Sequence, residues 1–272
     1  MYTSSLLILL GVIDDAIELG VFFRLIAQLI CCLIVIGSGL TIDHVGEYYY
    51  FGKVYLEPLS VIFTVFCVLG LTNSFNFIDG TDGLCAGLAI TSLFSILIFS
   101  VLLKTNIDFY DFNYLFLITF TLIIFLFFNL TSYFKIFLGD AGSMFLGFLI
   151  SFILIMVTQD EKEVLNPILT IWCVTLPVFD MISVVLRRLI KKINPFRPDR
   201  SHLHHICIEA GFSTFKTTFL ILFLSLILNF IGFYSYLFFG TDVALLLFLS
   251  LLFIYVYVTY RFSKRIIINQ NS

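Results

Sequence analysis

Residues 73–103 read NSFNFIDGTDGLCAGLAITSLFSILIFSVLL, a polar island followed by a long apolar run. The island, residues 73–83, holds two Asn, two Asp and two Gly. The run, residues 84–103, contains twenty residues and no charged side chain. About 20 apolar residues cross the hydrocarbon core of a bilayer as a helix. This stretch therefore predicts a membrane-spanning helix that begins directly after a segment rich in oxygen atoms.

Apolar runs of the same kind fill most of the chain, which has 272 residues and is 60% hydrophobic and 12% charged. A soluble domain is about 25% charged. Most runs are apolar all round, as expected for helices surrounded by lipid and by one another. We predict an all-α fold, a polytopic transmembrane helical bundle that forms a single domain over residues 1–272. About eight full spans are expected, at 22–41, 57–75, 84–103, 113–131, 142–158, 166–186, 217–238 and 243–260, with a partial span before Asp14.

Composition excludes several other classes of protein. The six cysteines form no CxxC pair, which argues against a zinc site or a disulfide framework. No Lys/Arg-rich arm or pattern of stacking aromatic residues predicts nucleic-acid binding. The first residues carry no basic segment and no small-residue cleavage site, so we expect no signal peptide there.

Four polar islands interrupt the apolar runs, and a carboxylate beside hydrocarbon costs about 2.5–3.5 kcal/mol on insertion scales. A chain that repeatedly places Asp at the ends of its spans is therefore expected to use these groups. Together, acidic, amide, Gly-rich and basic/His elements predict a metal-assisted phosphate site at a membrane face. The islands are GVIDD at 11–15, the segment 73–83, FLGDAGS at 137–143 and PFRPDRSHLHH at 195–205.

The distribution of Lys and Arg predicts the orientation of the chain, because cytoplasmic loops of membrane proteins carry an excess of these residues. With Asp14 on the cytoplasmic side, alternation of the spans places all four islands there. The opposite side keeps only Lys53, Lys104 and Lys162. The cytoplasmic side collects Arg24, Lys135, Arg187, Arg188, Lys191, Lys192, Arg197, Arg200, Lys216, Arg261, Lys264 and Arg265.

The first two islands supply carboxylates and amides. The adjacent Asp14 and Asp15 can bind a cation jointly, or one can accept a proton while the other orients it. The second island places Asn73, Asn76, Asp79 and Asp82 at intervals of three, which gives a slowly drifting stripe on a helix. Its glycines, Gly80 and Gly83, weaken a continuous helix and permit close approach of the backbone to a ligand. Oxygen ligands of this kind suit Mg²⁺ or Mn²⁺.

The third and fourth islands suit anions. Asp140 stands between two glycines where the next span opens, and a Gly-rich helix N-terminus is a natural seat for an anion. Asp140 there could hold a metal that itself holds phosphate, although a plain helix cap is the simpler interpretation. In the fourth island, Arg197 and Arg200 can make bidentate contacts with phosphate. His202, His204 and His205 lack further zinc ligands at suitable spacing, which favours phosphate or sugar contact over metal.

Taken together, these motifs resemble the polyprenyl-phosphate N-acetylhexosamine-1-phosphate transferase family. Asp14-Asp15 is similar to its Asp-Asp motif, and residues 73–84 are similar to its Asn-x-x-Asn-x-x-Asp-Gly-x-Asp-Gly-Leu motif. Residues 137–143 contain its Gly-Asp-x-Gly-Ser motif. Residues 198–205 resemble the Pro-Asp-Arg-x-His-x-His-His loop of its sugar-nucleotide branch.

The resemblance implies a role for each residue. Asn76 and Asp140 would ligate Mg²⁺, or Mn²⁺, on the nucleotide pyrophosphate, and Phe137 would lie against the uracil. Asp79 and Asp82 would support the metal and the nucleotide, and Asp14 and Asp15 would position or deprotonate the lipid phosphate. His202 would contact the sugar or its phosphate. The neighbouring substrate-binding residues would be Asn73, Arg197, Asp199, Arg200, His204 and His205.

The reaction that the resemblance implies transfers N-acetylglucosamine 1-phosphate from UDP-N-acetylglucosamine to undecaprenyl phosphate, releasing UMP. We expect this first membrane step of cell-surface polysaccharide or O-antigen synthesis on the cytoplasmic face of a bacterial inner membrane. The expected partners are the lipid phosphate, the UDP-sugar and membrane lipid. The oligomeric state stays open, with a homo-oligomer as one alternative.

The chain differs from the family at its start. Family members have about two further spans before the Asp-Asp motif, including a lysine-bearing end that contacts phosphate, whereas this chain begins inside the span before Asp14. We therefore expect an N-terminally shortened form with little or no activity. Two alternatives remain open at this point, an inactive truncated homologue and a polytopic transporter or flippase. Transporters place charge near the bilayer midplane and often contain repeats, whereas these acids lie at one face.

Overall fold

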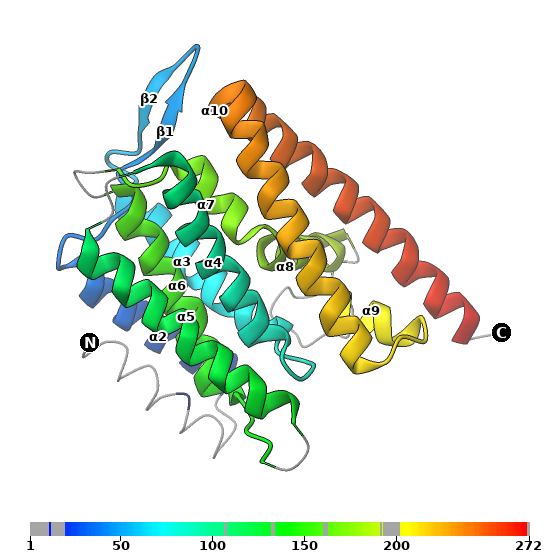
Figure 1. The fold of residues 1–272 in the computed structure, drawn as a ribbon. Helices are drawn as coiled ribbons and strands as arrows, with labels where there is room; N and C mark the ends of the chain where they lie inside the picture. Colours follow the sequence, from blue (N-terminus) through cyan, green and yellow to red (C-terminus); the bar gives the residue numbers. More distant parts are fainter. Residues whose placement is uncertain are drawn as a thin grey trace.

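The computed structural model describes residue 11 and residues 20–105, 108–131, 134–159, 163–190, 192 and 202–270, without the side chains of 109, 110 and 263–270. Its elements pack as a bundle of helices with one small hairpin (Figure 1). The helices are α2 (Val21–Ile36), α3 (Ser60–Ile78), α4 (Leu84–Leu103), α5 (Phe109–Leu130), α6 (Gly139–Gln159), α7 (Pro167–Cys173), α8 (Thr175–Ile190), α9 (Leu203–Glu209) and α10 (Thr214–Gln270). The strands are β1 (His44–Tyr48) and β2 (Gly52–Tyr55).

The predicted polytopic helical bundle is confirmed. Five helices of the described part are long and apolar enough to cross a membrane, or six if α7 and α8 form one broken span. Two of the eight predicted spans, 217–238 and 243–260, fall within α10. This helix folds back on itself at Gly240, whose φ of 80° and ψ of −175° are non-helical. Such dihedral angles are essentially restricted to glycine.

The predicted span 22–41 is wrong in its length. Helix α2 ends at Ile36 because Gly37, Ser38 and Gly39 follow, and Gly39 adopts a φ of 96°. Glycine weakens a helix by about 1 kcal/mol relative to alanine. The 16 residues of α2 extend about 24 Å at 1.5 Å per residue. That is shorter than a hydrocarbon core of about 30 Å.

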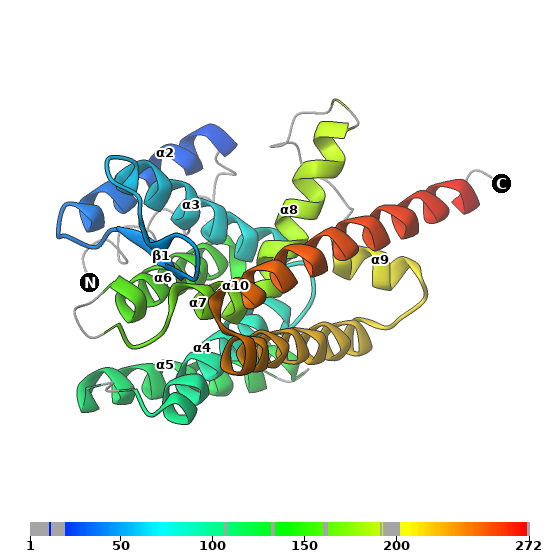
Figure 2. The ribbon, with the colours of Figure 1, turned by 90° about the horizontal axis from the view of Figure 1, so that it is seen from above.

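The predicted continuous span 166–186 is also wrong, because α7 and α8 meet at a bend of 77°. Pro177 lies in the first turn of α8 and has no N–H to donate to the carbonyl of Cys173. The fully buried Asn229 on α10 lies at this break, with its side-chain amide against the carbonyl groups that end α7. Helix α8 consequently runs across the other helices and away from them (Figure 2).

A two-stranded hairpin occupies part of 42–56, the connection between the predicted spans 22–41 and 57–75. Strands β1 and β2 pair antiparallel, and the tip Tyr49-Tyr50-Phe51 is exposed. The Tyr49 N–H donates to Asp242 Oδ2 at 3.0 Å, which fixes the hairpin beside the turn of α10. The hairpin and this turn mark one end of the bundle, and α9 lies at the other (Figure 1).

Glycines allow the helices to approach closely. A Cβ added to Gly147 of α6 would lie 2.7 Å from the Cα of Thr72 in α3. One added to Gly232 of α10 would lie 2.0 Å from the Trp172 ring. Helices in lipid gain no hydrophobic free energy from mutual contact, so close packing at small residues and hydrogen bonds hold them together.

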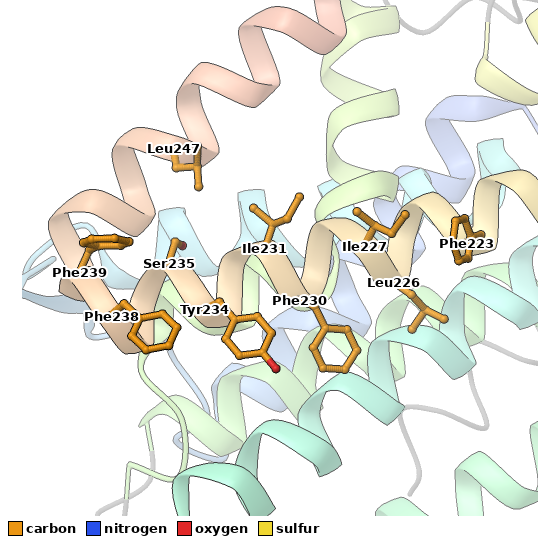
Figure 3. Close-up of a pocket in the computed structure, with 10 residues that line it drawn as sticks. All are labelled: Phe223, Leu226, Ile227, Phe230, Ile231, Tyr234, Ser235, Phe238, Phe239 and Leu247. Carbon is orange, nitrogen blue, oxygen red and sulfur yellow. The ribbon is translucent and has the colours of Figure 1, made fainter.

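A cleft of about 640 Å³ lies between the two arms of α10, away from the polar islands (Figure 3). Its lining is almost entirely aliphatic and aromatic and contains no charged side chain that could neutralise a phosphate. The polar chemistry of the protein is therefore found elsewhere. The lining residues are Phe223, Leu226, Ile227, Phe230, Ile231, Tyr234, Ser235, Phe238, Phe239 and Leu247.

The contact between α3 and α6 generates a prediction on stability. Gly147→Ala should destabilise the bundle by about 1–3 kcal/mol, because backbone atoms rather than a flexible side chain meet the new methyl group. Gly70→Ala is the matched control, since its Cβ would lie at an ordinary 3.6 Å from Met181 Cε. Thermal unfolding in detergent measures both. Equal melting temperatures for the two variants would show that the helices separate there at no cost.

Candidate functional site

The second and third islands meet where the end of α3 packs against the start of α6. The Asn76 side-chain amide donates to Asp140 Oδ1 and to Ser143 Oγ, both at 3.0 Å. Arg24 of α2 donates to the other oxygen, Asp140 Oδ2, at 3.2 Å. Residues 64 positions apart along the chain thus form one cluster, with the Asn76 carbonyl oxygen not used in either bond.

Asn73 lies one turn earlier on α3 and faces α2. Its amide donates to Gln28 Oε1 at 2.7 Å, and the Gln28 amide in turn contacts Met144 Sδ at 3.3 Å. Gln28 is fully buried. The described contacts of Asn73 therefore join three helices below the Asn76–Asp140 cluster, and its predicted substrate contact stays a prediction.

Asp79 and Asp82 do not continue the helical stripe. Helix α3 ends at Ile78, so only Asn73 and Asn76 share its face, and both aspartates lie in the turn before α4. Gly83 has a φ of 75° in this turn, and its N–H donates to Asn129 Oδ1 at 2.6 Å. The predicted stripe therefore holds only for Asn73 and Asn76, and the expected weakening of the helix by Gly80 and Gly83 is confirmed.

Asp79 lies close enough to two other carboxylates to feel their charge. Burial, followed by the negative charges of Asp140 and Asp82, raises the pKa of Asp79 to about 7. Asp82 pairs with Lys135 at 2.7 Å, and its carbonyl accepts from Thr218 Oγ1 at 3.0 Å. A concentration of negative charge that one lysine and one arginine only partly neutralise suits a cation.

Phe137 stands at the edge of this group of carboxylates. Its ring is 71% exposed and lies 5.0 Å below the Lys135 ammonium. An exposed aromatic face beside a cation offers a surface on which a planar base can stack. The arrangement is compatible with the predicted contact to uracil.

The histidines of the fourth island reach the second island through α9. His202 Nδ1 lies 2.7 Å from Asp180 Oδ2, and the His202 ring lies 5.8 Å from that of Phe77. His204 fits against Gly80, where an added Cβ would lie 2.1 Å from His204 Nε2. Burial, with the nearby rings of His205 and His202, lowers the pKa of His204 to about 3. His204 is therefore a neutral, buried group, and its ring centroid lies 4.0 Å from that of His205.

Five predicted site residues lie outside the described residues, namely Asp14, Asp15, Arg197, Asp199 and Arg200. Gly11, three positions before Asp14, is described and lies against the start of α6. A Cβ on Gly11 would come 2.1 Å from the Cα of Ala141, the residue after Asp140. Gly11, the described start of the first island, therefore lies beside the third island.

With this geometry established, comparison with known proteins defines the family. The model of glycosyl transferase family 4 matches residues 1–158, which include the first three islands. The chain belongs to glycosyl transferase family 4.

Curated relatives extend the similarity over the fourth island. The chain is 31% identical to the undecaprenyl-phosphate alpha-N-acetylglucosaminyl 1-phosphate transferase of Escherichia coli K12, over 96% of this chain and 72% of that protein. It is 33% identical to the protein of the same name from Haemophilus influenzae, over 94% and 74%. For the Yersinia pestis protein of that name, the identity is 32% over 84% of this chain and 63% of the relative.

The residues of the cluster fit a magnesium ion that is shared with phosphate. No group of three or more His, Cys, Asp or Glu in the described ranges could hold a metal by itself. Mg²⁺, however, is usually bound by one or two carboxylates together with waters and substrate phosphates. Asp140 supplies a carboxylate and Asn76 a neutral oxygen, and burial together with the charges of Asp140 and Asp82 raises the pKa of the neighbouring Asp79.

Sequence reasoning missed three members of the site, and two of them left a signal. Arg24 and Asp180 are charged residues inside the predicted spans 22–41 and 166–186. Ionisable residues within spans are costly and mark functional partners. Lys135 was counted only as a topological charge, and nothing local indicates its bond to Asp82, 53 positions away.

The pKa of Asp79 generates a prediction on pH dependence. Because its folded-state pKa of about 7 lies above the ordinary value of an aspartate carboxyl group, the folded state is progressively destabilised as the pH rises from about 4 to 7. Asp79→Asn removes this titration, so the variant should gain more in melting temperature over the parent at pH 8 than at pH 5. Thermal unfolding in chelator measures this, and Asp111→Asn, in the first turn of α5, is the control. A gain that does not change with pH would contradict the assignment.

Proposed function

We propose that this protein transfers N-acetylglucosamine 1-phosphate from UDP-N-acetylglucosamine to undecaprenyl phosphate. The products are undecaprenyl-diphospho-N-acetylglucosamine and UMP. The observation that carries the proposal is the joining of Asn76, Asp140 and Asp79 at one end of a membrane bundle from glycosyl transferase family 4. The curated relatives, whose names state this transferase activity, support it. The two alternatives, an inactive homologue and a transporter, are not favoured, because the names of the relatives state a transferase and the carboxylates of the islands lie at helix ends.

The chemistry is a displacement at phosphorus. An oxygen of the lipid phosphate attacks the β-phosphorus of the nucleotide sugar, and the bond from that phosphorus to the oxygen shared with the α-phosphate breaks. A phosphate monoester has a second pKa of about 6, so most of the lipid phosphate is already a dianion at neutral pH. Positioning and electrostatic stabilisation are therefore the main tasks of the protein.

The residues divide these tasks among them. Asn76 and Asp140 would hold Mg²⁺, or Mn²⁺, which supplies Lewis-acid neutralisation of phosphate charge when bound. Phe137 would stack on the uracil beside Lys135, and Asp79 and Asp82 would shape the field around the diphosphate. Asp14 and Asp15 would position the lipid phosphate, and the contact of Gly11 with Ala141 supports this role.

The location follows from the charge distribution. Twelve of the fifteen Lys and Arg residues fall on the side of the islands, so we place the site on the cytoplasmic face of a bacterial inner membrane. A UDP-sugar is a cytoplasmic metabolite, whereas the prenyl tail of the acceptor stays in the bilayer. The site lies where both can meet, and the product suits the first membrane step of a cell-surface polysaccharide.

One prediction of the proposed function concerns the metal. With the native gene product in membranes, release of UMP should stop in EDTA and return with Mg²⁺ or Mn²⁺. Asp140→Asn should lower turnover by about 100-fold or more at unchanged amounts of inserted protein. Asp111→Asn, which removes an exposed carboxylate at the opposite end of the bundle, should have no effect. Undiminished turnover in chelator would rule out the metal assignment.

Another prediction of the proposed function concerns the donor. The fourth island reads His202-Leu203-His204-His205, whereas three consecutive histidines are typical of the branch that uses a MurNAc-pentapeptide donor. UDP-N-acetylglucosamine should therefore be used at least about tenfold better than UDP-MurNAc-pentapeptide. Incorporation of labelled sugar phosphate into undecaprenyl lipid measures both. Equal or better turnover of the pentapeptide donor would overturn the proposed substrate.

A further inference from the structure

Asp180 is a buried carboxylate in the middle of α8, and only 2% of its surface is exposed. It accepts three hydrogen bonds. Oδ2 lies 2.7 Å from His202 Nδ1, and Oδ1 accepts from the Leu203 N–H at 2.9 Å and from the Tyr255 hydroxyl at 3.0 Å. One side chain thus joins α8, the start of α9 and the second arm of α10.

This arrangement selects one state of the His202 ring. A carboxylate is an acceptor only, so the nitrogen that faces it, Nδ1, must carry a hydrogen. The other nitrogen, Nε2, makes no hydrogen bond to the described residues, and the His202 side chain is buried, with 4% of its surface exposed. The bond to the Leu203 N–H fixes the backbone next to the ring, so both the tautomer and the position of His202 are set by Asp180.

The ring that Asp180 holds lies at the wall of the candidate site. His202 stacks 5.9 Å from His204, which is seated on Gly80, and lies 5.8 Å from Phe77. Phe77 and Gly80 belong to the island that also supplies Asn76 and Asp79. A displacement of the His202 ring therefore changes the surface presented to a bound diphosphate sugar.

We propose that Asp180, assisted by Tyr255, is the positioning residue for His202, and that it holds the ring with Nε2 directed to the sugar diphosphate. This inference rests on the proposed function, since it assigns His202 a contact with the donor. A second polar contact, one turn further along the same helices, provides a control. It distinguishes positioning of His202 from a simple contact between α8 and α10. Ser183 Oγ and Thr259 Oγ1, 2.7 Å apart, also join α8 to α10 but do not touch His202.

The substitution Asp180→Asn makes a specific structural prediction. Oδ1 accepts from the Leu203 N–H, and a backbone N–H can only donate. The side-chain oxygen of the asparagine must therefore remain at this position. Its NH₂ group then faces His202 Nδ1, which has to become an acceptor. The ring is driven into the tautomer with hydrogen on Nε2, as happens when the aspartate of a serine protease triad is replaced by asparagine.

Nitrogen-15 NMR of histidine-labelled protein in detergent measures this tautomer without any need for activity. The His202 signals, identified by their loss in His202→Gln, should show hydrogen on Nδ1 in the parent protein and on Nε2 in Asp180→Asn. Ser183→Ala should leave them unchanged. Identical tautomers in the parent and in Asp180→Asn would overturn the proposal.

Transferase kinetics test whether Asp180 acts through His202. Asp180→Asn should lower kcat by about 10- to 100-fold, and Tyr255→Phe should have a smaller effect. In a His202→Gln background, Asp180→Asn should cause no further loss, whereas independent roles would give additive losses. Ser183→Ala controls for the helix contact, and additive losses would contradict the proposal. An inactive parent protein would instead contradict the proposed function, and the tautomer measurement would still decide the role of Asp180.

Discussion

The close approach of α3 and α6 is the constraint on which the candidate site depends. Gly147 lets the two backbones meet at Thr72, and one turn further along each helix Asn76 reaches Ser143 and Asp140. A larger residue at the crossing would separate oxygens that are now 3.0 Å from the Asn76 amide. Because lipid provides no hydrophobic attraction between helices, packing and hydrogen bonding at this crossing act together.

The remaining carboxylates show how such a site is maintained next to hydrocarbon. Three carboxylates in and beside the site each contact a different basic side chain. Asp140 accepts from Arg24, Asp82 pairs with Lys135, and Asp180 contacts His202. Asp79 has no basic partner among the described residues. Its pKa of about 7 reflects burial among like charges. The paired carboxylates hold neighbouring segments together, whereas the negative charge around Asp79 attracts a cation.

Much of the fold could be predicted from sequence, because a charge-free run such as 84–103 has one stable state in a bilayer, and α4 has these bounds. The errors came from single residues. Gly37 and Gly39 end α2 early, and Pro177 bends the span that follows residue 166. Within the site, the motifs indicated Asn76 and Asp140, but the bond between Lys135 and Asp82 depends on the tertiary path of the chain. Asp180 was hidden by the apolar residues around it, although a lone carboxylate in a span is itself informative.

The backward turn at Gly240 connects the hairpin end of the bundle to the end that carries the candidate site. Tyr255 lies 15 residues further along α10, about 22 Å along a rigid helix. A change of about 10° in direction at the turn would swing its hydroxyl through about 4 Å by that length, more than enough to part it from Asp180. The hairpin bond between Tyr49 and Asp242 braces the pivot two residues past the glycine. The surface hairpin at one end of the bundle thus helps to position the Tyr255 hydroxyl against Asp180.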